Sequence, residues 1–129
     1  MPIDQLIPGK AHFISLAQAI AMTSLYRAEK ENILDKDSKG RNILPLCETF
    51  NRAEFDQVLS NDACVGLRFY YSMDEDLKLH MIVVGVNIEN EDILPDSSEE
   101  ERVIAASSGI IDTGNRCPMD CPPASPLNS

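Results

Sequence analysis

The sequence contains no tryptophan and few other aromatic residues. Aromatic side chains make up 5% of the 129 residues, so a core formed by this chain must be mainly aliphatic. Hydrophobic residues account for 43% and charged residues for 25%, which is typical of ordinary globular proteins. A chain of this length buries enough surface to fold as one domain without a metal ion or a disulfide.

Basic residues are also scarce. Eleven lysines and arginines face 21 acidic residues, and the formal net charge is −10. A field of this sign repels phosphate backbones and anionic lipid head groups, which argues against nucleic-acid or membrane partners. The sequence has no run of 18 apolar residues, and "MPIDQLIPGKAHF" lacks the pattern of an export signal. These absences predict a cytoplasmic protein whose four cysteines are free thiols.

Motifs that would identify an enzyme are missing as well. The sequence shows no phosphate-binding glycine loop, no nucleophile elbow and no H-E-x-x-H metal motif. We therefore predict no catalytic residue and no cofactor, and favour a protein that is not an enzyme.

Two helices are expected in the first half of the chain. Ser15 and Gln18 form the S-x-x-Q pattern of a capping box, which predicts an amphipathic helix over residues 15–33. A second, short helix is expected over residues 51–60. The predicted apolar face of the first helix is Leu16, Ala19, Ile20, Met22, Tyr26 and Ile33, and that of the second is Phe50, Phe55, Val58 and Leu59.

The clearest strand pattern lies in the middle of the sequence. "CVGLRFYYS" and "LKLHMIVVGVN" flank the acidic turn "MDED", which predicts a β-hairpin over residues 64–87 whose second strand is internal to a sheet. A third strand is expected from residues 43–47 or 103–112, because a hairpin alone is marginally stable. Residues 87–101 are expected to form a solvated loop, and residues 97–112 fit either a helix or strands. The predicted fold class is α+β, a small antiparallel sheet with both helices on one side.

The last fifteen residues form a tail rich in cysteine and proline. Its prolines predict an extended path for residues 115–129, docked either on a domain formed by residues 1–114 or on a neighbouring subunit. The segment Pro123–Pro126 also has the form of a polyproline ligand. The predicted interaction residues are Pro118, Pro122, Pro123 and Pro126.

Cys117 and Cys121 allow a chemical alternative, because two thiolates at C-x-x-x-C spacing can reach one metal ion. A zinc site would need two further ligands, and its candidates are Cys47, Cys64, His12 and His80. A redox-active pair is the other form of this alternative. His80 could also act as a base beside a carboxylate, although a half-buried structural histidine is the simpler interpretation.

Three segments carry a resemblance to a known family: "LPLCETFNRAEFDQVL", "CVGLRFYYSMDEDLKLHMIVVGVN" with "EDILP", and "RCPMDCPPASPLN". Over residues 43–95 and 115–128 the chain resembles a family of small bacterial proteins, mainly from Bacteroidetes, that has no assigned activity. The resemblance implies a compact α+β unit that ends in a Cys-Pro tail, and it transfers no catalytic residue.

The sequence thus predicts a non-enzymatic binding or assembly module that acts through a protein partner or through self-association. The alternative is a thiol-dependent site, either zinc-binding or redox-active, centred on Cys117 and Cys121.

Overall fold

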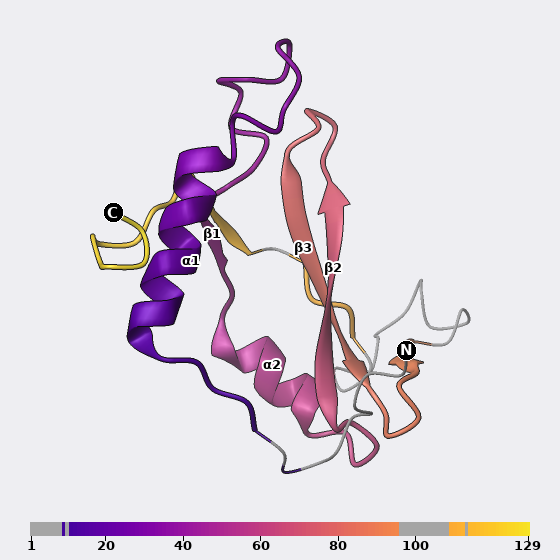
Figure 1. Ribbon diagram of the computed structural model, residues 1–129. Helices are drawn as coiled ribbons and strands as arrows, with labels where there is room; N and C mark the ends of the chain where they lie inside the picture. Colours follow the sequence, from indigo (N-terminus) through magenta and orange to yellow (C-terminus); the bar gives the residue numbers. More distant parts are fainter. Residues whose placement is uncertain (1–8, 10, 96–108, 113) are drawn as a thin grey trace. The chain divides into compact units, whose positions relative to one another are not determined.

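A computed structural model describes residues 9, 11–95, 109–112 and 114–129 (Figure 1). The described residues form an α+β fold, as predicted, with two helices, a two-stranded antiparallel sheet of order β1-β5 and a three-stranded sheet of order β2-β3-β4. It divides into two compact units, described separately below. The first unit comprises Met1–Ala11, Phe50–Tyr71 and Met81–Thr113, and the second comprises His12–Thr49, Ser72–His80 and Gly114–Ser129.

Two strands and a short third strand form a sheet that belongs mostly to the first unit, while the hairpin tip, Ser72–His80, is part of the second. The expected hairpin is present as β2 (Gly66–Met73) and β3 (Leu79–Val86), and β3 is the central strand, as predicted. The third strand is β4 (Asp92–Ile93), which pairs Gly85 with Ile93. The expectation of a continuous loop over residues 87–101 is therefore wrong.

The turn that begins at Asn87 explains why the chain returns to the sheet as β4. The side-chain oxygen of Asn87 accepts hydrogen bonds from the backbone N–H groups of Glu89 at 3.0 Å and Glu91 at 2.9 Å. This Asx turn reverses the chain and returns β4 to the edge of β3. The predicted third strand over residues 43–47 is not part of this sheet, whereas Ile111 from the other predicted segment forms a single bridge to Val83. Residues 97–108, where a helix or strands were expected, lie outside the described residues.

The core of the first unit lies between β3 and α2 (Arg52–Leu59). Val58 from the helix packs with Val83 and Ile111, and each is at most 6% exposed. Phe50, Phe55, Cys64 and Leu67 surround them. The predicted apolar side of α2 is correct except for Leu59, which is 49% exposed because it lies at the last position of the helix.

The second unit contains α1 (Leu16–Glu29), and its capping box is present as predicted. The Ser15 hydroxyl accepts from the Gln18 N–H at 3.0 Å, and the Gln18 side chain accepts from the Ser15 N–H at 2.9 Å. The helix ends four residues earlier than predicted. Asn32 donates from both its backbone and its side chain to Glu29, and this local turn replaces the next helical turn.

The segment before β1 (Cys47–Thr49) lies along α1. The Tyr26 hydroxyl donates to the Pro45 carbonyl at 2.6 Å, and the Lys30 ammonium donates to the Leu44 carbonyl at 3.2 Å. Burial raises the pKa of Tyr26, which keeps this hydroxyl a donor. No helix in the described part of the chain is long and apolar enough to cross a membrane.

Candidate functional site

The two-stranded sheet of the second unit positions two of the four cysteines. Strand β1 pairs antiparallel with β5 (Asn115–Cys117), and the register places Cys47 opposite Cys117 and Glu48 opposite Arg116. Directly opposed residues of an antiparallel pair project from the same face of the sheet. Cys47 and Cys117 therefore share one face, and Glu48 and Arg116 share the other.

Cys117 and Cys121 form a disulfide, with their Cα atoms 4.5 Å apart. The expectation that these two cysteines are free thiols is therefore wrong. A turn follows β5, and the Asp120 N–H closes it by donating to the Arg116 carbonyl at 3.0 Å. This turn brings Cys121 back to Cys117, a proximity that four-residue spacing alone does not specify. Cys117 is 1% exposed, whereas Cys121 is at the surface.

Three of the proposed zinc ligands take part in other interactions, and these are Cys64, Cys117 and Cys121. Cys64 belongs to the first unit, where its thiol donates to the Gly66 carbonyl at 3.2 Å and packs against the core. Cys117 and Cys121 are bonded to each other, so they do not present a pair of thiolates. Within the described residues, no cluster of three or more His, Cys, Asp or Glu side chains is arranged to hold a metal ion.

Arg116 occupies the opposite face of the same sheet and is 9% exposed. Its guanidinium donates to the Leu79 carbonyl at 2.7 Å, to the Ile43 carbonyl at 2.7 Å and to the Asn42 carbonyl. It thereby joins β5 to the segment before β1 and to the hairpin tip, all within the second unit. No sequence motif indicated this role, because partners contributed by three separate segments leave no local pattern.

His80 lies between two carboxylates of the second unit. Its Nε2 is 2.8 Å from Asp74 Oδ2, and its Nδ1 is 3.6 Å from Glu48 Oε2. The Lys78 backbone N–H and then the His80 ring hold the pKa of Asp74 below its usual value. The nearby carboxylate that a base role for His80 would require is thus present. Because both ring nitrogens face acidic groups, the arrangement is that of a structural histidine held between two carboxylates.

The tail continues along the second unit after the disulfide. The Arg27 guanidinium of α1 donates to the Leu127 carbonyl at 2.6 Å, and the Asn128 side chain closes a turn with the Ser125 N–H at 2.9 Å. Among the predicted interaction residues, Pro118 is half-buried, whereas Pro122, Pro123 and Pro126 are exposed. A hollow of about 290 Å³ is lined by Thr49, Asn115, Asp120, Cys121, Pro122 and Pro123.

The two faces of α1 differ in their surroundings. Half-buried residues follow helical spacing along one face and comprise Ala19, Ile20, Thr23, Tyr26 and Arg27. The opposite face is exposed although it is apolar, with Met22 and Leu25 each 64% exposed. The predicted buried face was therefore right for Ala19, Ile20 and Tyr26 and wrong for Leu16, Met22 and Ile33. Ile33 lies beyond the helix end, and Leu16 is its first residue.

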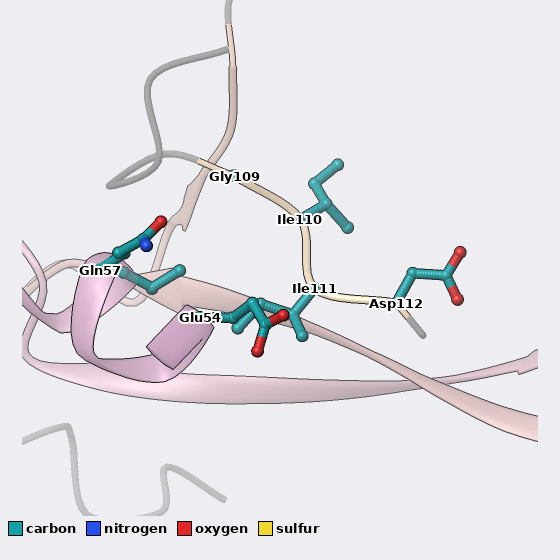
Figure 2. A pocket seen from close by; sticks show the side chains of 7 residues that line it. Glu54, Gln57, Gly109, Ile110, Ile111 and Asp112 are labelled. Atoms are coloured by element: carbon teal, nitrogen blue, oxygen red, sulfur yellow. The ribbon is translucent and has the colours of Figure 1, made fainter. Parts of the chain in front are cut away.

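The first unit offers a second hollow, of about 320 Å³, between α2 and residues 109–112 (Figure 2). Val58 and Ile111 form its apolar wall, and Glu54 and Gln57 project from the helix beside it. Asp112 points away from these side chains in Figure 2. Glu54 and Asp112 therefore do not form the paired carboxylates of a general acid–base site.

A polar cluster connects β2 with β4 in the same unit. The Arg68 guanidinium and the Tyr70 hydroxyl both donate to the carboxylate of Asp92. The hydrogen bond from Tyr70, and then the one from Arg68, hold the pKa of Asp92 below its usual value. Both charged side chains of this cluster, Arg68 and Asp92, have partners. The cluster therefore stabilises the edge strand β4 and leaves neither charged group free to bind a ligand.

Comparisons with known proteins found no matching family model, no similar curated protein and no similar solved structure. The resemblance to the Bacteroidetes family stays a prediction.

Proposed function

We propose that this protein is a non-enzymatic association module in which the exposed face of α1 binds the same face of a second copy. The observation that carries the proposal is that no residue of α1 is buried, although nine of its fourteen residues are hydrophobic. Large exposed apolar surfaces on a folded protein usually mark an interaction site. We call the exposed face formed by Ala21, Met22 and Leu25 the α1 face.

Charge favours a second copy as the occupant. The chain carries a net charge of −10, yet no acidic residue occurs between Asp4 and Glu29. Most surfaces of two copies repel each other, whereas Ala21, Met22 and Leu25 are uncharged and Glu29, one turn beyond Leu25, is the single carboxylate of α1. A twofold pairing of helices would bury Met22 and Leu25 of each copy against each other, in the self-complementary manner of a symmetric dimer.

The same charge supports the absence of nucleic-acid and membrane partners, and we propose the cytoplasm as the compartment. Disulfides of cytoplasmic proteins are usually transient and either catalytic or redox-sensing. This location would therefore make the bond between Cys117 and Cys121 a reversible one. A thiol-dependent function is the second candidate, and it is favoured by this disulfide and not by metal-ligand geometry.

Sedimentation equilibrium of the full chain tests the association. We expect the unaltered protein to form dimers and Met22→Glu with Leu25→Glu to be monomeric, because both changes place carboxylates on each α1 face. Ile88→Glu is the matched control, because Ile88 is similarly exposed at 52% but lies in the first unit. A monomeric unaltered protein, or equal dissociation by the control, would refute the proposal. A larger oligomer that the α1 changes leave intact would refute it as well.

A further inference from the structure

We propose that Cys47, Cys117 and Cys121 form an intramolecular thiol–disulfide exchange site. In this exchange, the bond Cys117–Cys121 converts into Cys47–Cys117 and releases Cys121 as an exposed thiol. The proposal rests on a free thiol that lies opposite one sulfur of a disulfide in the β1-β5 pair. It is independent of the association through α1.

The register supplies the geometry. Directly opposed residues of an antiparallel pair have Cβ atoms about 4.5–5.5 Å apart, and a disulfide requires about 3.5–4.5 Å. The Cys47 and Cys117 side chains project from the same face, so a small approach of the two strands brings the pair into bonding range. Cys64 has no such position, because it is a core residue of the first unit.

The exchange is balanced without an added oxidant or reductant. The Cys47 thiolate attacks the sulfur of Cys117, and a bond between these two sulfurs forms while the bond from Cys117 to Cys121 breaks. The electron pair leaves on the sulfur of Cys121, which takes up a proton equivalent to the one that Cys47 lost. One disulfide and one thiol are present before and after the step.

Burial gives the three sulfurs different roles. Cys117 is buried at 1% exposure and belongs to the disulfide in both states, so it serves as the shared central sulfur. Cys121 is exposed and lines the hollow of about 290 Å³ with Pro122 and Pro123. The exchange therefore replaces a thiol that is half-buried in the sheet with one that external thiols and disulfides can reach. In the new state, the disulfide also ties β1 covalently to β5.

The positions of the methionines allow the two states to be distinguished chemically. Cleavage after methionine by cyanogen bromide in acid, where exchange stops, separates Cys117 from Cys121 at Met119. It also places Cys47 and Cys64 together in the fragment of residues 23–73. The bond from Cys117 to Cys121 links fragment 82–119 to fragment 120–129, whereas the exchanged bond links fragment 23–73 to fragment 82–119.

The experiment uses the full chain, first equilibrated with oxidised glutathione at low concentration. It is then freed of glutathione, incubated at mildly alkaline pH, quenched in acid and cleaved. We expect the linkage of fragments 23–73 and 82–119 to appear, together with a free Cys121 that is alkylated in the released fragment 120–129. Cys64→Ser should behave as the unaltered protein does, whereas Cys47→Ser should lose this linkage completely.

Cys121→Ser provides a second test that removes the competing bond. Under oxidised glutathione it should form the linkage of Cys47 to Cys117 in most molecules. The proposal is overturned if fragment 82–119 is linked only to fragment 120–129 under all conditions, or if Cys117 forms no disulfide. It is also overturned if Cys47→Ser leaves the exchange unchanged. Sedimentation of the same samples reports separately on the association through α1.

Discussion

The two units of this protein are stabilised by different kinds of interaction. The first unit has an apolar centre, where Val58 and Val83 are 1% and 0% exposed. The second unit buries Ile43 and Cys117 as well, but beside them buried Arg116 donates to backbone carbonyls, and His80 lies between carboxylates. Apolar packing depends on area and shape, whereas buried polar groups depend on specific partners. The second unit should therefore be more sensitive to the loss of one partner, to acid and to reductant.

Arg116→Met should produce the largest effect. The change keeps an apolar side chain of similar length but removes donors from the carbonyls of Leu79 and Asn42. Hydrogen bonds from charged groups contribute about 1.5–3 kcal/mol each, so we expect a loss of about 3 kcal/mol in the free energy of unfolding. Urea denaturation measures the loss, and amide exchange at Cys117 and Val83 shows which unit opens.

Arg52→Met is the matched control, because the Arg52 side chain is 90% exposed and pairs only with Asp56 at 3.1 Å in the described structure. Exposed pairs of this kind contribute at most about 1 kcal/mol. Equal losses for the two variants would contradict a structural role for Arg116.

Val83→Ala tests the apolar centre of the first unit. Val83 is fully buried, so removing two methyl groups loses their transfer free energy and leaves a cavity. We expect a loss of about 2 kcal/mol, smaller than that for Arg116→Met. Val65→Ala, at a half-buried position, should cost clearly less. Amide exchange should accelerate around Val58 before it does around Cys117, and the reverse order would contradict the assignment of separate centres.

Gly85→Ala tests how closely that centre is packed. An added Cβ would lie 3.0 Å from the Cys64 sulfur and 3.0 Å from a methyl carbon of Val58. Overpacking of this kind costs about 1–3 kcal/mol, and we expect a value near the lower end because both neighbours are side-chain atoms. Adding Cys64→Ala should restore part of the loss. If the losses of stability from Gly85→Ala and Cys64→Ala simply add in the double variant, the contact between residue 85 and the Cys64 sulfur does not limit packing.

The sequence predicted the local features more successfully than the long-range ones. Ser15 and Gln18 interact across three residues, and the hairpin strands are joined by a short turn, so both features leave patterns within one window. The pairing of β1 with β5 joins residues about seventy positions apart, and neither three-residue strand has a distinctive alternation. The exposure of residues within α1 also depended on which segments pack against the helix, which explains the error at Met22.

The candidate site shows the same limit. The cysteine pair was recognisable as a chemical feature, but its disulfide depended on the turn closed by Asp120 and Arg116. The position of Cys47 opposite Cys117 became visible only with the register of the two strands. Spacing identifies sulfurs that are close in sequence, and it gives no information on a third sulfur brought in by another strand.

Acid should destabilise both units by a smaller amount, through Asp74 in the second and Asp92 in the first. Both groups have a pKa below the usual value, since Lys78 N–H and His80 stabilise the Asp74 carboxylate and Tyr70 and Arg68 stabilise that of Asp92. A depressed pKa means that the unfolded chain binds the proton more tightly. The contribution is thus complete above the ordinary pKa of an aspartate and is lost as the pH falls through the lower value in the folded protein.

Urea denaturation at a series of pH values below 5 measures this effect, with Asp74→Asn and Asp92→Asn as the matched pair. Each variant should be less stable than the unaltered protein at neutral pH and should lose less stability on acidification. Amide exchange should show that Asp74→Asn weakens the dependence of stability on pH in the second unit and that Asp92→Asn weakens it in the first. If both variants change the dependence of stability on pH in the same unit, the two units do not titrate independently. The contrast between the apolar packing of the first unit and the polar contacts of the second would then not extend to their response to acid.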